Sequence, residues 1–163
     1  MATDQQPAAP PAIESPWPAP NGIWASYDLH CHCGSVRYSM KISPPLFEDQ
    51  TEGKEQYTAI ECHCSHCERQ GALCVHPLVE NIQWTQGLEH RGTYLCASKK
   101  NPHFYCKNCG CFLASDLTWL TENVMKGENR MTINLRMLKD VDLSKLKIRQ
   151  QYFMKNIPPK YEV

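Results

Sequence analysis

Two short stretches, Cys31-His-Cys-Gly34 and Cys106-Lys-Asn-Cys-Gly110, set the architecture that we expect for this chain. In each, two closely spaced cysteines are followed by a glycine, which tolerates a tight turn better than any other residue. Such a turn is a knuckle, and its backbone N–H groups can stabilise thiolates. The two pairs are the natural halves of a four-cysteine zinc site. A site of this kind ties distant strands together and supplies on the order of 10 kcal/mol of folding free energy.

A third cluster, Cys62-His-Cys-Ser-His-Cys67, lies between the two pairs in the sequence. Two, three and two thiols make seven, which divides into a closed set of four for a structural zinc and an open set of three for a catalytic zinc. An incoming thiol binds an open zinc position as thiolate, and a thiolate can add to an electrophilic carbon or leave from one. The spacing alone equally allows a second closed site. Its fourth ligand would then be Cys74, Cys111, His63 or His66.

The composition supports a single metal-binding domain. The chain has 163 residues, and all ten cysteines lie between Cys31 and Cys111, a density that indicates either disulfides or metal. Seventeen Lys and Arg balance seventeen Asp and Glu, and this zero net charge argues against binding to the phosphate backbone of nucleic acid. No apolar run approaches the roughly 18 residues that a membrane helix needs.

The N-terminal segment decides between disulfides and zinc. Residues 1–22 hold six of the twelve prolines and no Lys or Arg, so they lack the features of a secretory signal or a mitochondrial transit peptide. We therefore expect a cytoplasmic protein, in which thiols stay reduced and clustered cysteines bind zinc. The expected organisation is a disordered Pro/Ala-rich tail over residues 1–22, a zinc domain over 23–155 and a C-terminal tail over 156–163.

The rest of the chain consists mostly of short strand patterns separated by turn signals, which predicts a mainly β fold with antiparallel sheets. One helical turn is expected after Cys67 and another over residues 142–146, with Asp142 as its cap. Residues 43–56 and 98–102 are interpreted as loops, and the basic last nineteen residues as a solvated face. The predicted strands are 26–31, 35–40, 57–61, 73–79, 82–85, 91–95, 103–106, 112–115 and 131–136.

Three motifs stand out when the clusters are read with their neighbours. They are Cys31-His-Cys-Gly-Ser-Val-Arg-Tyr38, Cys62-His-Cys-Ser-His-Cys-Glu-Arg-Gln-Gly71 and Phe104-Tyr-Cys-Lys-Asn-Cys-Gly110. In order and spacing they resemble the glutathione-dependent formaldehyde-activating enzyme family, which includes the centromere protein V branch. The resemblance extends from about residue 29 to about residue 146 and takes in the segment 133–138.

The resemblance implies a β-tent fold, with antiparallel sheets built around a structural zinc. It implies that this zinc is held by Cys31, Cys33, Cys106 and Cys109. It also implies a second, catalytic-type zinc, and so two zinc ions per chain. The second ion would be held by Cys62, Cys64 and Cys67. The founding activity of the family joins formaldehyde and glutathione into S-hydroxymethylglutathione, a reaction of the carbon–sulfur lyase type.

Two positions depart from the family pattern. Glu68 stands where a basic residue is common, so it either alters the charge near the open site or faces solvent. Cys111 stands where small residues are common, and it either joins a metal site or packs as a small hydrophobe. Packing is the interpretation that we adopt for Cys74, Cys96 and Cys111 alike.

Other polar residues are weaker candidates. His103 could act as an acid or base, although a solvated or core histidine is the ordinary interpretation. Glutathione carries two carboxylates, and the candidates to bind them are Arg69, Arg91 and Lys99. The histidines inside the knuckles are expected to point away from the metal. They are His32, His63 and His66.

The sequence therefore predicts a zinc-dependent carbon–sulfur lyase that binds the thiolate of glutathione, or of a glutathione or thiol adduct, at an open three-cysteine zinc. Two alternatives stay open: a non-catalytic zinc module that binds a protein partner, and a zinc hydrolase that uses metal-bound water. The expected partner is a small molecule, with neither nucleic acid nor a membrane involved. The electrophile, the pathway and the oligomeric state, with a homodimer as one option, stay undetermined.

Overall fold

The computed structural model describes residues 20–47, 59–96, 98–125, 127–140 and 142–155. In these residues the protein is mainly β, as the sequence predicts. The strands are β1 Ala25–His30, β2 Arg37–Ile42, β3 Ala59–Cys62, β4 Leu73–Val75, β5 Ile82–Gln86, β6 Arg91–Leu95, β7 Pro102–Cys106, β8 Phe112–Asp116, β9 Met131–Asn134 and β10 Ile148–Gln151. The helices are α1 Ser65–Gln70 and α2 Thr118–Leu120, which continues as a π-helix over Thr121–Met125. Single 3₁₀ turns cover Val79–Asn81, Leu88–His90, Leu135–Met137, Leu143–Lys145 and Phe153–Lys155.

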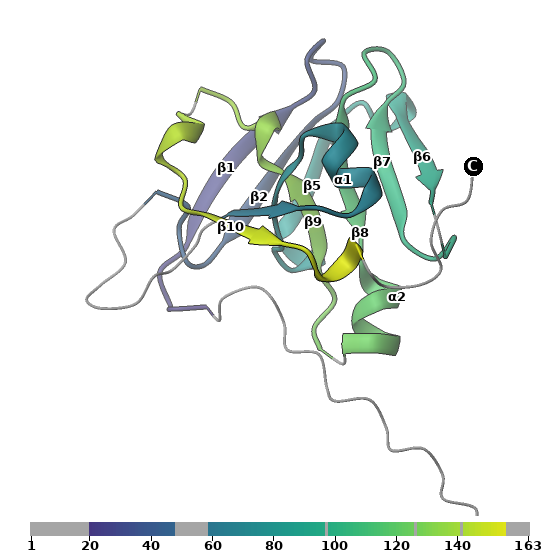
Figure 1. Ribbon diagram of the computed structural model, residues 1–163. Helices are drawn as coiled ribbons and strands as arrows, with labels where there is room; N and C mark the ends of the chain where they lie inside the picture. Colours follow the sequence, from purple (N-terminus) through teal and green to yellow (C-terminus); the bar gives the residue numbers. More distant parts are fainter. Residues whose placement is uncertain (1–19, 48–58, 97, 126, 141, 156–163) are drawn as a thin grey trace, which may run out of the picture.

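The strands form two sheets. One has three strands in the order β1-β2-β5, and the other has seven in the order β10-β3-β4-β9-β8-β7-β6. Figure 1 shows β1 and β2 on one side of the molecule, β6 and β7 on the other, and α1 between them in this view. Each sheet pair is antiparallel except β10 with β3, which run parallel and so correct the purely antiparallel expectation.

The hydrophobic core joins the two sheets. In β2, Tyr38, Met40 and Ile42 are buried while the alternate positions are exposed or half-buried, as a strand with one apolar face requires. β8 and β9 lie in the middle of the larger sheet and are buried almost throughout. The Tyr38 hydroxyl donates a hydrogen bond to the carbonyl of Leu113 on β8 at 3.2 Å. Burial raises the pKa of this phenol well above its usual range, so the hydroxyl remains a donor.

Most predicted strands are present, with ends that match or are shifted by one or two residues. The predicted strand 73–79 is shorter in the structure. It ends at Val75, because Pro77 has no N–H to donate to a sheet ladder. The helical turn expected after Cys67 instead begins at Ser65, since Cys64 serves as the N-cap. The second expected turn is confirmed, with the Asp142 side chain accepting the N–H of Ser144 at 3.0 Å.

Besides several single 3₁₀ turns, one strand and one helical segment were not predicted. The strand β10 is polar and exposed over most of its length, so no alternation of apolar residues indicates it in the sequence. Its backbone pairs in parallel with β3 over four residues. The α2 segment and its π-helical continuation were also missed, because only Leu120 and Thr121 of this stretch are buried.

Several predictions lie outside the described residues. These are the N-terminal tail up to residue 19, most of the loop 43–56, the start of the predicted strand 57–61 and the C-terminal tail 156–163. The proposed domain limits at 1–22, 23–155 and 156–163 therefore stay predictions. In the described part of the chain, no helix is long and apolar enough to cross a membrane.

Candidate metal centres

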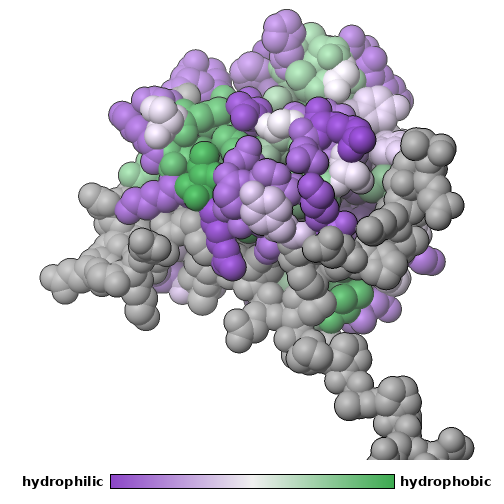
Figure 2. Space-filling model, in the orientation of Figure 1, coloured by the Kyte–Doolittle hydropathy of each residue, from purple (hydrophilic) through white to green (hydrophobic). Residues whose placement is uncertain are grey.

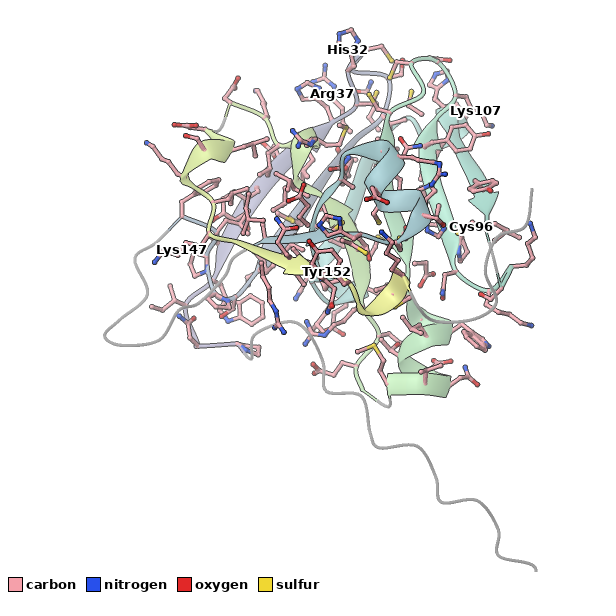
Figure 3. The ribbon with its side chains drawn as sticks, in the orientation of Figure 1. His32, Arg37, Cys96, Lys107, Lys147 and Tyr152 are labelled. Atoms are coloured by element: carbon pink, nitrogen blue, oxygen red, sulfur yellow. The ribbon has the colours of Figure 1, made fainter. Side chains whose placement is uncertain are left out.

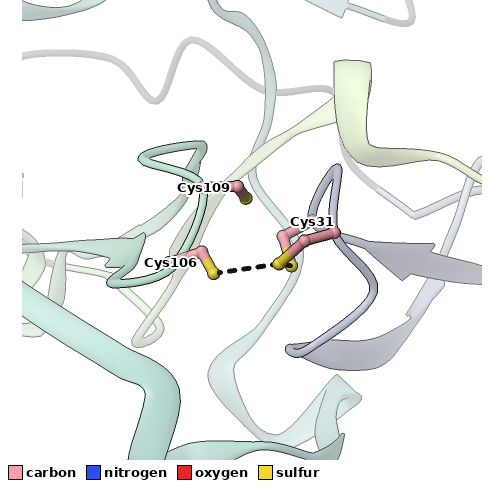
Figure 4. Close-up of side chains that lie close together, drawn as sticks. Cys31, Cys106 and Cys109 are labelled. Carbon is pink, nitrogen blue, oxygen red and sulfur yellow. Dashed lines mark hydrogen bonds between the residues drawn. The ribbon is translucent and has the colours of Figure 1, made fainter.

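The first cysteine cluster lies where the two sheets meet. Cys31 and Cys33 belong to the turn between β1 and β2, Cys106 ends β7, and Cys109 belongs to the turn between β7 and β8. The four Sγ atoms all lie within 4.8 Å of one another. Figure 4 shows Cys31, Cys106 and Cys109 of this set close together. The structure thus brings together residues that are more than seventy positions apart and that the sequence predicted as one ligand set.

The spacing of these sulfur atoms suits a tetrahedral metal. The Sγ atoms of Cys31 and Cys33 are 3.5 Å apart, and those of Cys33 and Cys106 are 3.7 Å apart. A Zn–S bond of about 2.3 Å in a tetrahedron gives an S···S edge of about 3.8 Å. Four soft thiolate donors are also the set that a structural zinc prefers. The residues present therefore fit a zinc ion.

Both turns have the knuckle geometry that the sequence indicated. Gly34 and Gly110 have φ of 73° and 76°, in the left-handed region that favours glycine. Their N–H groups donate to the carbonyls of Cys31 at 2.9 Å and Cys106 at 2.8 Å, which closes each turn. The N–H of Val36 donates to Cys31 Sγ at 3.3 Å, so backbone donors do stabilise the sulfur of this set.

The four thiols differ in burial. Cys31 and Cys106 are fully buried, Cys33 is exposed and Cys109 is half-buried. Burial raises the pKa of Cys106 to about 12. Hydrogen bonds with Ser35 lower the pKa of Cys33. A buried thiol with a raised pKa becomes a thiolate only beside a cation, so Cys106 requires a metal to ionise near neutral pH.

The second cluster is built at the junction of β3 and α1. Cys62 ends β3, Cys64 is the N-cap of α1 and Cys67 lies in its first turn. Their three Sγ atoms lie within 4.8 Å of one another. Cys64 Sγ accepts the backbone N–H of Cys67 at 3.4 Å, which is the hydrogen bond that starts the helix. The three sulfurs therefore come from one short local segment, formed by the end of β3 and the start of α1.

Hydrogen bonding within this triplet concentrates negative charge on one sulfur. Hydrogen bonds from Cys62 and Cys67 lower the pKa of Cys64 to about 2, and the same contact raises the pKa of Cys62. Three contacting thiols without a cation share one negative charge in this way. A divalent cation would allow all three to ionise, so the donor set fits zinc here as well.

No fourth ligand joins the triplet among the residues that the structure describes. Cys74 is buried beside Cys67 in the same hydrophobic cluster, yet its sulfur is not part of the ligand group. Cys111 packs against the main core, near the first cluster. The rings of His63 and His66 are stacked on aromatic neighbours. None of the four residues considered for a closed second site therefore belongs to the group of ligand atoms that lie within 4.8 Å of one another.

The strand β10 holds one side of the triplet loop. The ring of His63 stacks on Tyr152 with centroids 4.2 Å apart, and the backbone N–H of His63 donates to the carbonyl of Gln151 at 2.9 Å. The Gln150 side chain accepts from the His63 ring and donates to Glu61 at 2.5 Å. Figure 3 shows Tyr152 at the end of β10. The C-terminal run expected to be only a solvated face therefore also supports the candidate metal site.

On the other side of α1, two histidines lie edge to face. The rings of His66 and His103 are 4.3 Å apart, and His66 also contacts Phe112 at 5.0 Å. Burial lowers the pKa of His66 to about 4 and also lowers the pKa of His103. His103 Nδ1 is 2.9 Å from the carbonyl of Asn101, and the ring lies close to the thiol of Cys96.

The charged residues suggested for substrate binding are spread out. Arg91 stacks over the rings of Trp84 and Phe104 at 4.6 and 4.2 Å, which is a packing role within the sheets. The exposed side chain of Arg69 on α1 donates to the carbonyl of Ser65 at 2.8 Å. Figure 2 shows that hydrophilic residues cover most of the face over α1 and β10, with apolar residues gathered in separate patches.

Two further charged residues have contacts of their own. Lys99 donates to the carbonyl of Leu95 at 2.9 Å and lies near Cys96. Glu68, the departure from the family pattern, has its Oε1 atom 3.6 Å from Nδ1 of His63, and its side chain is half exposed. Its carboxylate therefore remains in contact with solvent.

Comparison with known proteins adds the family. Residues 26–156 match the family described as glutathione-dependent formaldehyde-activating enzyme. The chain belongs to this family. A crystal structure of a Rhodobacter sphaeroides protein superposes with a TM-score of 0.54 over 76% of this chain and 98% of that one, at 20% sequence identity. At this identity the likeness concerns the fold alone. No curated protein matches the chain.

Membership of the glutathione-dependent formaldehyde-activating enzyme family confirms the resemblance that the cysteine motifs indicated. The residues around the triplet were harder to predict. The roles of Gln150 and Tyr152 had no signal in the sequence, because a short polar run carries no pattern that sets it beside residues 61–63. The contact of Cys96 with His103 depends on a loop between neighbouring strands, and the two residues are only seven positions apart.

Proposed function

We propose that this protein is a zinc-dependent carbon–sulfur lyase that acts on glutathione, or on a glutathione or thiol adduct. The observation that carries the proposal is the grouping of Cys62, Cys64 and Cys67 without a fourth ligand among the described residues. Three ligands leave one tetrahedral position for a substrate atom, and a soft metal with sulfur ligands favours sulfur there. The family match, which names glutathione and formaldehyde activation, supports the same chemistry.

A zinc ion, when bound, supplies a Lewis-acid centre that favours the thiolate form of a thiol. The protein contributes the geometry. The N-terminus of α1 stabilises negative sulfur, because its N–H groups and helix dipole favour anions. The hydrogen bond from the Cys67 N–H to Cys64 Sγ fixes one of the three donors. The contacts of Gln150 and Tyr152 with His63 support the loop of residues 62–67 on its outer side.

The other four cysteines have a structural role in this proposal. Cys31, Cys33, Cys106 and Cys109 form a closed set that cross-links the two sheets. A closed set leaves no position for a substrate. Each chain would accordingly carry two zinc ions with different tasks, one for folding and one for chemistry. We further expect a cytoplasmic protein whose partner is a small-molecule thiol, with a homodimer as one option for its assembly.

Two experiments test the proposal together. Anaerobic native mass spectrometry of the full chain, with and without glutathione, should show two zinc ions and one bound glutathione, and it also reports the oligomeric state. Cys64→Ser should lose one zinc and the turnover of thiol–aldehyde adducts while the fold remains. Cys74→Ala is the matched control, because Cys74 is buried in the same cluster but outside the ligand group, and this variant should keep both.

The outcomes separate the alternatives. Intact adduct turnover in Cys64→Ser would show that the mechanism is wrong, and one zinc per parent chain would contradict the four-plus-three division. Two zinc ions with no thiol binding and no turnover would favour a non-catalytic module that binds a protein partner. Turnover that needs no thiol would favour a zinc hydrolase.

A further inference from the structure

His103 is held in one orientation and one tautomer. It lies on β7, opposite Tyr94 on β6 and Ser115 on β8, and is mostly buried. Its Nδ1 is 2.9 Å from the carbonyl oxygen of Asn101. A carbonyl can only accept, so Nδ1 carries the hydrogen and the lone pair of the neutral ring is on Nε2. His103 therefore has the arrangement of an oriented base.

A thiol lies against the ring of His103. Cys96 Sγ is 3.7 Å from Nε2 and 3.8 Å from Nδ1, so the sulfur is almost equally far from both nitrogens and off the line of the Nε2 lone pair. Because Nδ1 is engaged with the Asn101 carbonyl, it is the Nε2 lone pair that can accept a hydrogen from another group. The contact with Cys96 shows that a sulfur atom fits beside this ring.

His103 also lies beside the triplet. Its ring is 4.3 Å from that of His66, which stands between Cys64 and Cys67 in α1. Phe112 contacts both histidine rings and belongs to the hydrophobic cluster that contains Cys67. The charge of Cys64 acts on both histidines. The base and the sulfur ligands therefore share one small region, bounded by β7, β8 and α1.

We propose that His103 Nε2 accepts the proton of the substrate thiol and returns it to the carbonyl oxygen as the carbon–sulfur bond forms. This inference rests on the proposed function. A sulfur lone pair makes the new C–S bond, and the π electrons of the carbonyl move to its oxygen. The proton passes from sulfur to Nε2 and then to that oxygen, so nothing is oxidised or reduced. Cleavage of the adduct is the same sequence in reverse.

The surroundings of His103 keep its ring neutral. Burial lowers its pKa, so the ring is neutral and can accept a proton near pH 7. The titratable groups that face it are His66 from α1, and Tyr94 and Cys96 from β6 and the segment after it. The neighbours on β8 are Phe112 and Ser115, which do not titrate near neutral pH. Protonation of His103 is then stabilised when a thiolate forms nearby.

The direct test uses the parent protein with both metals bound. Long-range ¹H–¹⁵N correlation spectra of histidine-labelled protein should show His103 protonated on Nδ1 and unprotonated on Nε2. Saturating glutathione should convert it to the doubly protonated ring. An Nε2 that stays unprotonated in the glutathione complex would overturn the proposal, whether or not any variant folds.

Variants give a second readout besides turnover. Calorimetric titration with glutathione, in two buffers of different ionisation enthalpy, counts the protons released on binding. The parent should release almost none, and His103→Gln about one, because the thiol proton then has no acceptor in the protein. Turnover in His103→Gln should fall by about a hundredfold or more while glutathione affinity changes little. Equal proton release in the two proteins, with turnover within about threefold, would refute the assignment.

Matched controls separate this inference from the function that it rests on. His90→Gln replaces a partly exposed histidine outside this region, and it should behave as the parent in both measurements. Cys96→Ala should also keep turnover, since its thiol lies off the line of the Nε2 lone pair. If His66→Gln but not His103→Gln changes the proton count, the acceptor is His66 and the proposal is wrong. A parent protein that neither binds glutathione nor turns over adducts would refute the proposed function first, and the inference with it.

Discussion

Replacement of Cys106 by serine should destabilise the whole domain. Cys106 is fully buried, and its sulfur lies 3.7 Å from that of Cys33 in a set that links the two sheets. A metal cross-link between these residues closes a loop of 73 positions. Chain entropy then gives a stabilisation of about 4 kcal/mol. This is a large part of the roughly 5–15 kcal/mol by which an ordinary domain is stable.

The stability of Cys64→Ser is the value with which the stability of Cys106→Ser should be compared. Cys62 and Cys67 are only five positions apart, so the same entropy expression gives about 2 kcal/mol for a link between them. The triplet also lies within one β3–α1 unit and joins no separate sheets. We therefore expect Cys106→Ser to lose at least twice as much stability as Cys64→Ser.

Urea unfolding followed by circular dichroism, with zinc in slight excess, measures the difference. The parent and Cys64→Ser should unfold in cooperative transitions, whereas Cys106→Ser should be largely unfolded without urea or have a much lower midpoint. A chelator should have the same effect on the parent as the Cys106 substitution. The reasoning would fail if both variants had the same midpoint, because the four-cysteine set would then not cross-link the sheets.

Three further predictions concern the supports of the site and the effect of pH. Gln150→Ala should weaken zinc binding at the triplet by about tenfold, because the loop loses its outer support; competition with a chelator measures this, and an unchanged affinity would show that the contact is incidental. Arg136→Ala removes the Nε hydrogen bond to the Gly71 carbonyl at the end of α1, and should lower the free energy of unfolding by about 1 kcal/mol; a variant as stable as the parent to urea would rule this out. Burial lowers the pKa of His76 from 6.5 to about 3, so the unfolded chain binds this proton first as pH falls. The contribution of His76 to the free energy of unfolding is therefore complete above pH 6.5 and declines as the pH falls from there towards 3. Urea unfolding at several pH values should show a smaller decline of this free energy in His76→Leu than in the parent. The same dependence on pH in both proteins would contradict the prediction.

The cysteine motifs made much of the site predictable. Pairs such as Cys31 and Cys33 are local, so their spacing shows directly that two sulfurs can reach one metal. Strand positions were also predictable where one face is buried, as in β2, because alternation then appears in the sequence. The start of α1 was placed too late because the cap is a cysteine, which is not a usual helix N-cap.

Contacts between distant, patternless segments could not be predicted. The strand β10 is polar, and its parallel pairing with β3 depends on backbone hydrogen bonds that have no preference for particular side chains. The contacts of Gln150 and Tyr152 with His63 depend on that pairing. The position of His103 beside His66 likewise requires β7 to lie next to β8 in the larger sheet.

The sequence by itself determined the mainly β class, the three cysteine clusters and the family. These properties are encoded in residue types at short spacing, where the chain has few ways to separate them. Only the tertiary structure decided that the set of four joins two sheets, that no fourth ligand from the described residues completes the set of three, and that an oriented histidine lies beside it. Those facts depend on which strands become neighbours, and the packing of the whole core selects those neighbours.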